Sequence, residues 1–144
     1  MKTKALTKIV SISICMAVLL LALSSCSKKI YFNTSSVVPA AVGYAKIKKD
    51  KNGNFAIDIS ISNLAEVERL EGHKKVYVVW MNSSHENPKN LGQINSDTKG
   101  FSRKLMASFH TVSSIEPSKL YITAEEDGGV QYPGNYEVLT TESL

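Results

Sequence analysis

The chain has 144 residues, of which 43% are apolar and 21% are charged, with 17 basic and 13 acidic side chains. This length predicts one domain, and it is too short for a TIM barrel or a two-domain dinucleotide-binding enzyme. The apolar content suffices for a hydrophobic core and excludes an intrinsically disordered chain.

The first 25 residues have the three-part pattern of a secretory signal. Three lysines within the first eight residues precede an apolar run from Ile9 to Leu23. This run is shorter than the roughly 20 residues of a membrane-spanning helix. We expect residues 1–25 to be a helical signal peptide that is removed; the alternative is an uncleaved anchor helix. Removal takes away those three lysines and Cys15, which leaves 119 residues with 14 basic and 13 acidic side chains.

The apolar run ends in Leu23-Ser24-Ser25-Cys26, where two small residues separate an aliphatic residue from a cysteine. This pattern resembles the lipobox of bacterial lipoproteins. The resemblance implies cleavage between Ser25 and Cys26, with diacylglycerol and an N-acyl lipid attached covalently to Cys26; no other cofactor is expected. Two or more acyl chains give a stable anchor. The resemblance therefore implies a lipid-anchored protein of the bacterial cell envelope that faces away from the cytoplasm, at either the inner or the outer membrane.

Residues 26–36 form a polar segment interrupted by Ile30-Tyr31-Phe32. We expect this segment to be a lipid-anchored tether, because ten flexible residues span only about 17 Å and would keep the domain near the bilayer. The three apolar residues either dip into the membrane interface or cap the domain.

Residues 37–144 show a hydrophobic period of two. The clearest case is 54–62, where Phe55, Ile57, Ile59 and Ile61 alternate with small or polar residues, as in a half-buried strand. Lys51-Asn52-Gly53 predicts a hairpin turn between this strand and a strand at 40–49. Further strands are predicted at 76–81, 90–95, 101–109, 119–125 and 136–141.

One segment departs from the strand pattern. Asn63 is a candidate N-cap for a short helix that would end near Gly72, and a plain loop is the alternative. With about seven short strands, residues 37–144 predict an all-β fold: a single antiparallel β-sandwich, immunoglobulin-like, with Trp80 in its core.

The second half of the chain contains three motifs in order: Val76-Tyr77-Val78-Val79-Trp80, Asn87-Pro88-Lys89-Asn90-Leu91-Gly92, and Ile122-Thr123-Ala124-Glu125 followed by Gly128-Gly129 and Pro133. Over residues 74–140 this order resembles the extracytoplasmic C-terminal domain of the anti-sigma-K factor family. The resemblance implies a β-sandwich outside the cytoplasm. It does not imply sigma-factor binding, because the family's cytoplasmic domain and membrane helix have no counterpart in this sequence.

The charges are distributed unevenly. Residues 26–51 carry six lysines and one acid, whereas 120–144 carry five acids and no base. Mutual pairing of the two ends is the simpler expectation, and a basic docking surface is the alternative. A nearly neutral domain outside the cytoplasm gives no reason to expect nucleic-acid binding.

No motif points to catalysis or to a metal. His73, His85 and His110 lack the spacing of metal ligands, and the neighbours in Ser83-Ser84-His85-Glu86 are not placed as a triad. The acidic run that ends at Asp127 lacks the alternating carboxylates of a calcium loop, so a solvated turn is the expectation and a calcium site the alternative.

Aromatic residues offer the remaining candidate contacts. Alternation predicts core positions for Tyr77 and Tyr136 and exposure for Tyr44, Tyr121 and Tyr132, which could stack on a sugar or peptide beside Glu125; ordinary packing within the sandwich is the alternative. The expected function is non-enzymatic: binding, sensing or interaction at the membrane with an unidentified envelope protein or glycan. The alternatives are a small periplasmic or surface hydrolase that uses His85 or His110, and a purely structural role in envelope assembly.

Overall fold

The computed structural model describes residues 28–84, 87–98 and 105–144, which form nine strands and one 3-10 turn. The strands are β1 Lys28–Tyr31, β2 Val42–Lys49, β3 Phe55–Ser62, β4 Val76–Asn82, β5 Lys89–Ile94, β6 Ser96–Thr98, β7 Leu105–Ser113, β8 Lys119–Glu125 and β9 Glu137–Thr140, and the turn η1 is Val67–Arg69. Within this part of the chain no helix is long and apolar enough to cross a membrane.

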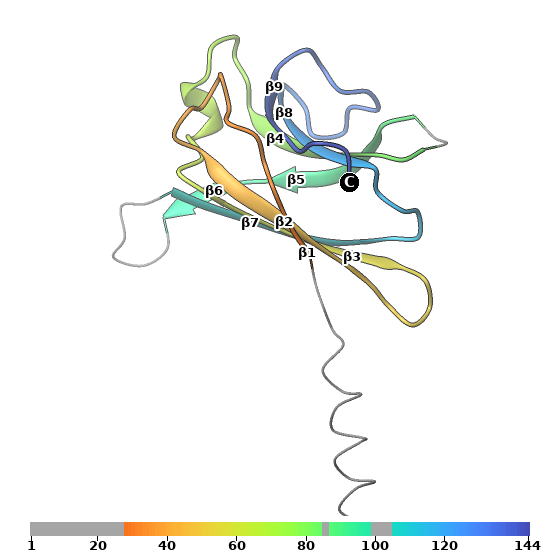
Figure 1. Cartoon of the computed structure of the whole chain (residues 1–144). Coiled ribbons are helices and arrows are strands. Elements are labelled where there is room, and N and C mark those ends of the chain that lie inside the picture. Colours follow the sequence, from red (N-terminus) through yellow and green to blue (C-terminus); the bar gives the residue numbers. More distant parts are fainter. Residues whose placement is uncertain (1–27, 85–86, 99–104) are drawn as a thin grey trace, which may run out of the picture.

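The strands form two antiparallel sheets that lie face to face (Figure 1). The five-stranded sheet has the order β1-β2-β3-β7-β6, and the four-stranded sheet has the order β5-β4-β8-β9. From β2 to β6 the first sheet follows the A-B-E-D order of immunoglobulin-like domains, and the second follows C′-C-F-G. The predicted all-β, immunoglobulin-like sandwich is confirmed, with β1 and β6 as two short edge strands beyond the seven expected.

Most strand positions agree with the sequence pattern to within two residues. The exception is β7, which begins at Leu105 and ends at Ser113 instead of at residue 109; the first four residues of that predicted strand, 101–104, lie outside the described residues. The core follows the alternation: Ile57, Ile59 and Ile61 of β3 are each at most 2% exposed. They pack against inner-face side chains of the other sheet that include Tyr77, Val79, Met81, Leu120, Ile122 and Leu139.

Residues 28–36 belong to the sandwich rather than to a tether. β1 pairs with β2, and Phe32, which is 9% exposed, forms an isolated bridge with Thr141 beside the four-stranded sheet. The backbone N–H of Asn33 donates to the carbonyl of Thr140 at 2.8 Å. The chain thus crosses from one sheet edge to the other directly after β1. Phe32 belongs to the hydrophobic core, so this segment caps the domain.

The segment after β3 is a loop with one 3-10 turn, not the predicted helix. Asn63 has a φ of 58°, whereas an N-cap residue needs extended backbone. The buried Leu64 and Val67 hold the loop on the core. The Tyr77 hydroxyl donates to the carbonyl of Ala65 at 2.9 Å, and burial, followed by the charge of Glu68, raises the pKa of Tyr77 far above its ordinary range. This hydroxyl therefore keeps its proton and its hydrogen bond.

Candidate functional site

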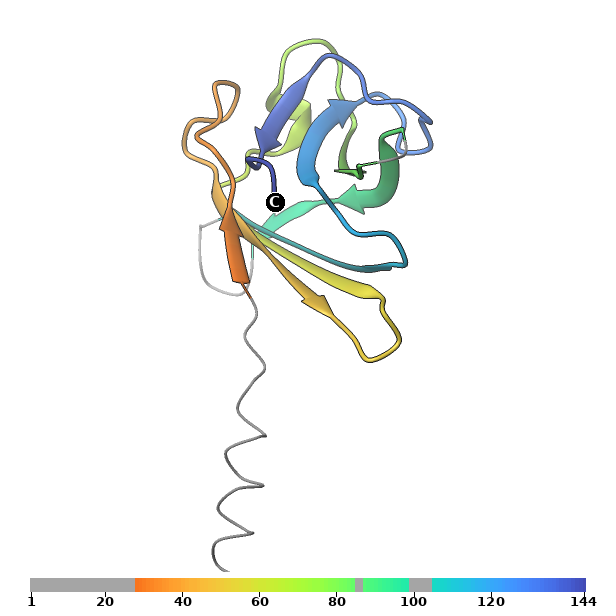
Figure 2. The same cartoon turned by 45° about the vertical axis from the view of Figure 1, so that its right-hand side comes forward.

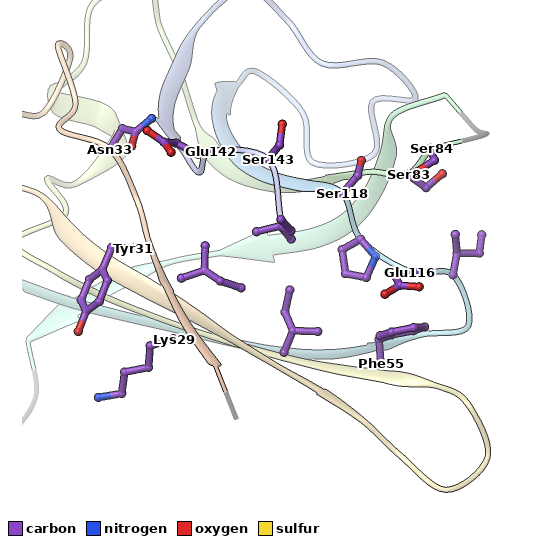
Figure 3. A pocket seen from close by; sticks show the side chains of 15 residues that line it. Lys29, Tyr31, Asn33, Phe55, Ser83, Ser84, Glu116, Ser118, Glu142 and Ser143 are labelled. Carbon is purple, nitrogen blue, oxygen red and sulfur yellow. The ribbon is translucent and has the colours of Figure 1, made fainter. Parts of the chain in front are cut away.

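A cleft of about 870 Å³ opens beside β1, between the edges of the two sheets (Figure 3). Its lining comes from β1, from the ends of β2, β3 and β4, from the β7–β8 connection and from the last three residues of the chain. Segments that are far apart in the sequence therefore meet around one cavity.

The course of the two chain ends creates this cleft. After β9, the backbone N–H of Thr141 donates to the carbonyl of Leu120, and that of Leu144 donates to Ser118, which holds the tail along the start of β8. β1 remains in the other sheet. Figure 2 shows the C-terminus beside the segment that leads out of β1. The gap between β1 and the tail is the cleft.

The lining combines apolar and polar side chains. Its apolar members are Ile30, Ile47, Phe55, Ile115, Pro117 and Leu144. Its charged members are Lys29, Glu116 and Glu142. The Oγ atom of Ser83, another lining residue, is buried and has no hydrogen-bond partner among the described residues. A mainly apolar cavity with a few polar groups is the usual form of a ligand site.

The four ligand contacts predicted from sequence do not meet at this cleft. Tyr44 lies on the outer face of the five-stranded sheet, and Tyr132 is 67% exposed in the β8–β9 loop. Tyr121 was expected to be exposed, but it is only 7% exposed, and Glu125 is 6% exposed. Burial, and then the charge of Glu137, raises the pKa of Tyr121.

Trp80 is fully buried, but it does not lie in the core between the sheets as the sequence predicts. It faces the outer side of the four-stranded sheet, where its ring stacks on Tyr121 with a centroid distance of 6.4 Å and an interplanar angle of 15°. The reason is that β4 carries apolar side chains on both faces. Tyr77, Val79 and Met81 occupy the inner face, which leaves Trp80 on the outer one.

A chain of hydrogen bonds fixes the buried polar groups around Trp80. The Trp80 Nε1–H donates to Oγ1 of Thr123 at 2.8 Å, and the Thr123 hydroxyl donates to Oε1 of Glu125 at 2.6 Å. The same carboxylate oxygen accepts the backbone N–H of Gly134 at 2.8 Å. A Cβ atom at Gly134 would lie 2.8 Å from Oε2 of Glu125, so this approach needs glycine. Glu125 therefore holds the loop and is not available to a ligand.

The β8–β9 loop is held from β5 as well. The register between β4 and β5 shifts between Val79 and Trp80, which leaves Leu91 of β5 without a partner next to Asn90. The Asn90 side-chain amide donates to the carbonyls of Gly128 and Val130 at 3.0 and 2.9 Å. Of the residues that carry the resemblance to the anti-sigma-K factor domain, Asn90, Thr123 and Glu125 thus contribute to holding the β8–β9 loop.

The histidines do not form a catalytic arrangement within the described residues. His110 Nδ1 lies 2.6 Å from Asp58 Oδ1, but both side chains are more than half exposed on an open sheet face. His73 lies in an exposed loop. No group of three metal-ligating side chains is found in the described ranges. His85 and Glu86, like Ser25 and Cys26, lie outside those residues.

The two oppositely charged ends of the chain do not pair. Among side chains that the structure describes, no ion pair joins a lysine of 28–51 to an acid of 120–144; the ion pairs found are Arg69–Glu66 and His110–Asp58. The lysines of 28–51 lie on or beside strands of the five-stranded sheet, whereas the acids of 120–144 lie on or beside strands of the four-stranded sheet. The expectation of mutual pairing is therefore wrong, because the ends belong to different sheets.

Comparison of the chain with family models, with curated proteins and with solved structures finds no match.

Proposed function

We propose that this chain is a lipid-anchored module of the bacterial cell envelope that binds an extended segment of another envelope protein in the cleft beside β1. It performs no chemistry of its own. The observation that carries the proposal is that the cleft is lined by the first strand after Cys26, so the anchor and the binding site share one segment.

The position of Cys26 relative to β1 limits where the cleft lies. Cys26 precedes Lys28, the first residue of β1, by two residues, and each residue spans at most about 3.6 Å. A lipid on Cys26 would therefore hold β1 within about 7 Å of the attachment point. The cleft then faces ligands at the bilayer surface.

The edge of β1 supports a peptide as the ligand. Among the described strands β1 pairs with β2 alone, so its other side offers backbone groups that no described strand pairs with, next to the cleft. An extended segment can add to such an edge as a further strand, with alternate side chains in apolar pockets. Ile30, Ile115 and Leu144 supply apolar surface, and Glu116 with Glu142 supplies polar contacts.

The test uses the full chain in its native envelope with a photo-crosslinking amino acid at Ser84, an exposed residue that lines the cleft. Ile115→Trp fills the cleft and should abolish the protein adduct. The matched control Val112→Trp changes a side chain that is 58% exposed on the outer face of β7 and should leave the adduct intact. An adduct that survives Ile115→Trp, or glycan adducts alone, would overturn the peptide assignment.

The anchor is tested in the same strains. Cys26→Ala should leave a longer, unprocessed precursor without acyl chains, detected by the mass of the purified chain. An unchanged mature mass and an unchanged membrane fraction would exclude Cys26 as the anchor.

A further inference from the structure

The outer face of β1 and β2 combines lysines with tyrosines in a regular pattern. Lys29 and Tyr31 of β1 and Tyr44, Lys46 and Lys48 of β2 point away from the core; we name these five side chains the basic aromatic face. The strand register places Lys29 opposite Lys46 and Tyr31 opposite Tyr44. Two like charges directly opposite each other destabilise a strand pair. This arrangement therefore needs a compensating partner.

The described residues only partly supply that compensation. The ammonium groups of Lys29 and Lys46 lie 4.7 and 5.8 Å from the centroid of the Tyr44 ring, which gives a modest cation–π attraction. The acid opposite Lys46 on β3 is Asp58, and its carboxylate lies 2.6 Å from His110. The lysines of the face form no ion pair within the described residues and present net positive charge to their surroundings.

Protection of a sheet edge does not account for this face. Lysine on an edge strand hinders unwanted strand pairing, and that explanation covers Lys29. Lys46, however, lies on β2 between Lys29 of β1 on one side and Asp58 of β3 on the other. Its charge protects no edge.

Exposed apolar groups are concentrated on the same sheet. Tyr31, Val42 and Val112 are 66%, 60% and 58% exposed, and they make up three of the five large exposed apolar side chains of the described residues. Tyrosine and lysine are both suited to a membrane interface, because each joins an apolar body to a polar or charged end. The opposite sheet carries Lys89 and Lys119 on its strands beside the exposed acids Glu126 and Glu137, so its charges of opposite sign offset one another, unlike those of the basic aromatic face.

We infer that the basic aromatic face lies on the anionic headgroups of a phospholipid bilayer. The inference rests on the proposed anchor, since Lys29 is three residues from Cys26 and thus within about 11 Å of it. The lysines contact lipid phosphates, the tyrosine rings enter the interface, and the four-stranded sheet faces away. The anchor then fixes which side of the domain meets the membrane.

The test uses the full chain reconstituted into phosphatidylcholine vesicles with and without phosphatidylglycerol. A fluorescent amino acid replaces Ser60, whose register partner is Tyr44, and in a separate chain it replaces Gln131 in the loop on the opposite sheet. In anionic vesicles the Ser60 probe should shift to the blue and be quenched by headgroup-labelled lipid, whereas the Gln131 probe should not change. Salt at 1 M should reverse the shift, because the screening length falls to about 3 Å.

Lysine replacement sets the expected size of the effect. The measured quantity is the ratio of molecules whose basic aromatic face contacts the membrane to molecules whose face does not. Each of Lys29→Gln, Lys46→Gln and Lys48→Gln should lower this ratio about fivefold. The matched control replaces Lys74, Lys75 and Lys89, which flank strands of the other sheet, by glutamine and should have no effect.

Two results would overturn the inference: equal emission from the two probe positions in anionic vesicles, or a Ser60 shift of the same size in phosphatidylcholine alone. The first would leave the face to an acidic protein partner. Whether Cys26 is acylated is determined in a separate measurement, which is the mass of the chain. Without acylation, the apolar segment 9–23 still attaches the chain to the vesicle from the same end, so the probes still report on the face.

Discussion

The two sheets of the sandwich differ in how far the side chains on their outer faces are exposed. On the four-stranded sheet Trp80 is 0% exposed and Tyr121 is 7% exposed, because the β8–β9 loop folds over them. On the five-stranded sheet Tyr31 is 66% exposed, and no loop among the described residues covers the face (Figure 1). Aromatic side chains therefore form a second, smaller core on the four-stranded sheet, whereas on the five-stranded sheet Tyr31 is exposed at the surface.

The difference shows what an outer face needs in order to be buried. The β8–β9 connection covers residues 126–136, and Glu125 and Asn90 supply hydrogen-bond partners for its backbone. The connection between β2 and β3 covers only residues 50–54, and Asp50 satisfies its backbone within the turn itself. A short turn whose backbone is satisfied within itself cannot reach across a sheet, so this turn leaves Tyr31 and Val42 of the five-stranded sheet exposed.

The sharpest test of this difference compares the free energy of unfolding of two variants, Trp80→Ala and Tyr44→Ala. Loss of the buried indole should lower the free energy of unfolding by about 3–5 kcal/mol. Tyr44→Ala removes a partly exposed ring and should cost about 1 kcal/mol or less. Urea unfolding followed by circular dichroism measures both. Equal losses would show that the two outer faces contribute alike to stability.

Glu125→Ala tests whether the loop is held by the buried carboxylate. The Gly134 N–H and the Thr123 hydroxyl would lose their acceptor, which should cost about 1.5–3 kcal/mol. The neighbouring exposed acid provides the matched control, since Glu126→Ala should stay within about 0.5 kcal/mol of the unmodified chain. Hydrogen exchange of the loop amides should rise in the first variant only; unchanged exchange there would contradict the role of Glu125.

The smallest effect concerns the open sheet and depends on pH. The Asp50 carboxylate accepts backbone N–H bonds from Asn52 and Asn54, and these bonds, that of Asn54 first, hold the pKa of Asp50 below its ordinary value of 3.8. A depressed pKa stabilises the fold above the unfolded-state value and loses that contribution as the pH falls through the folded-state value. Asp50→Ala should therefore unfold at lower urea than the unmodified chain at neutral pH, and this gap should narrow as the pH falls below the ordinary value of 3.8. The gap for Lys51→Ala should not change over that range; a constant gap for Asp50→Ala would contradict the assignment.

The sequence pattern predicts much of the sandwich because most of its strands have one buried face. Ile57, Ile59 and Ile61 reveal both the strand and the side that faces the core. β4 gives no such information. Its side chains are apolar on both faces, so alternation does not indicate which of them face the core. The position of Trp80 depends instead on a loop some fifty residues further along the chain.

The cleft was not predicted, although one signal for it was present. Ile30-Tyr31-Phe32 interrupts a polar segment, and such a short strand becomes stable only through its pairing with β2 and the contact of Phe32 with the other sheet. These are long-range contacts that local propensity does not encode. The same holds for Tyr121. The alternation places its side chain on the outer face of the sheet, but it does not indicate that the ring of Trp80 stacks on it there.

The place of Leu144 has a practical consequence for work on this domain. Leu144 lines the cleft and is hydrogen-bonded to Ser118 through its backbone. Any affinity tag or fluorescent protein fused after this residue would start inside the cavity and compete with whatever binds there. The turn at Asn52 and Gly53, which are not among the lining residues, is the better place for an inserted epitope.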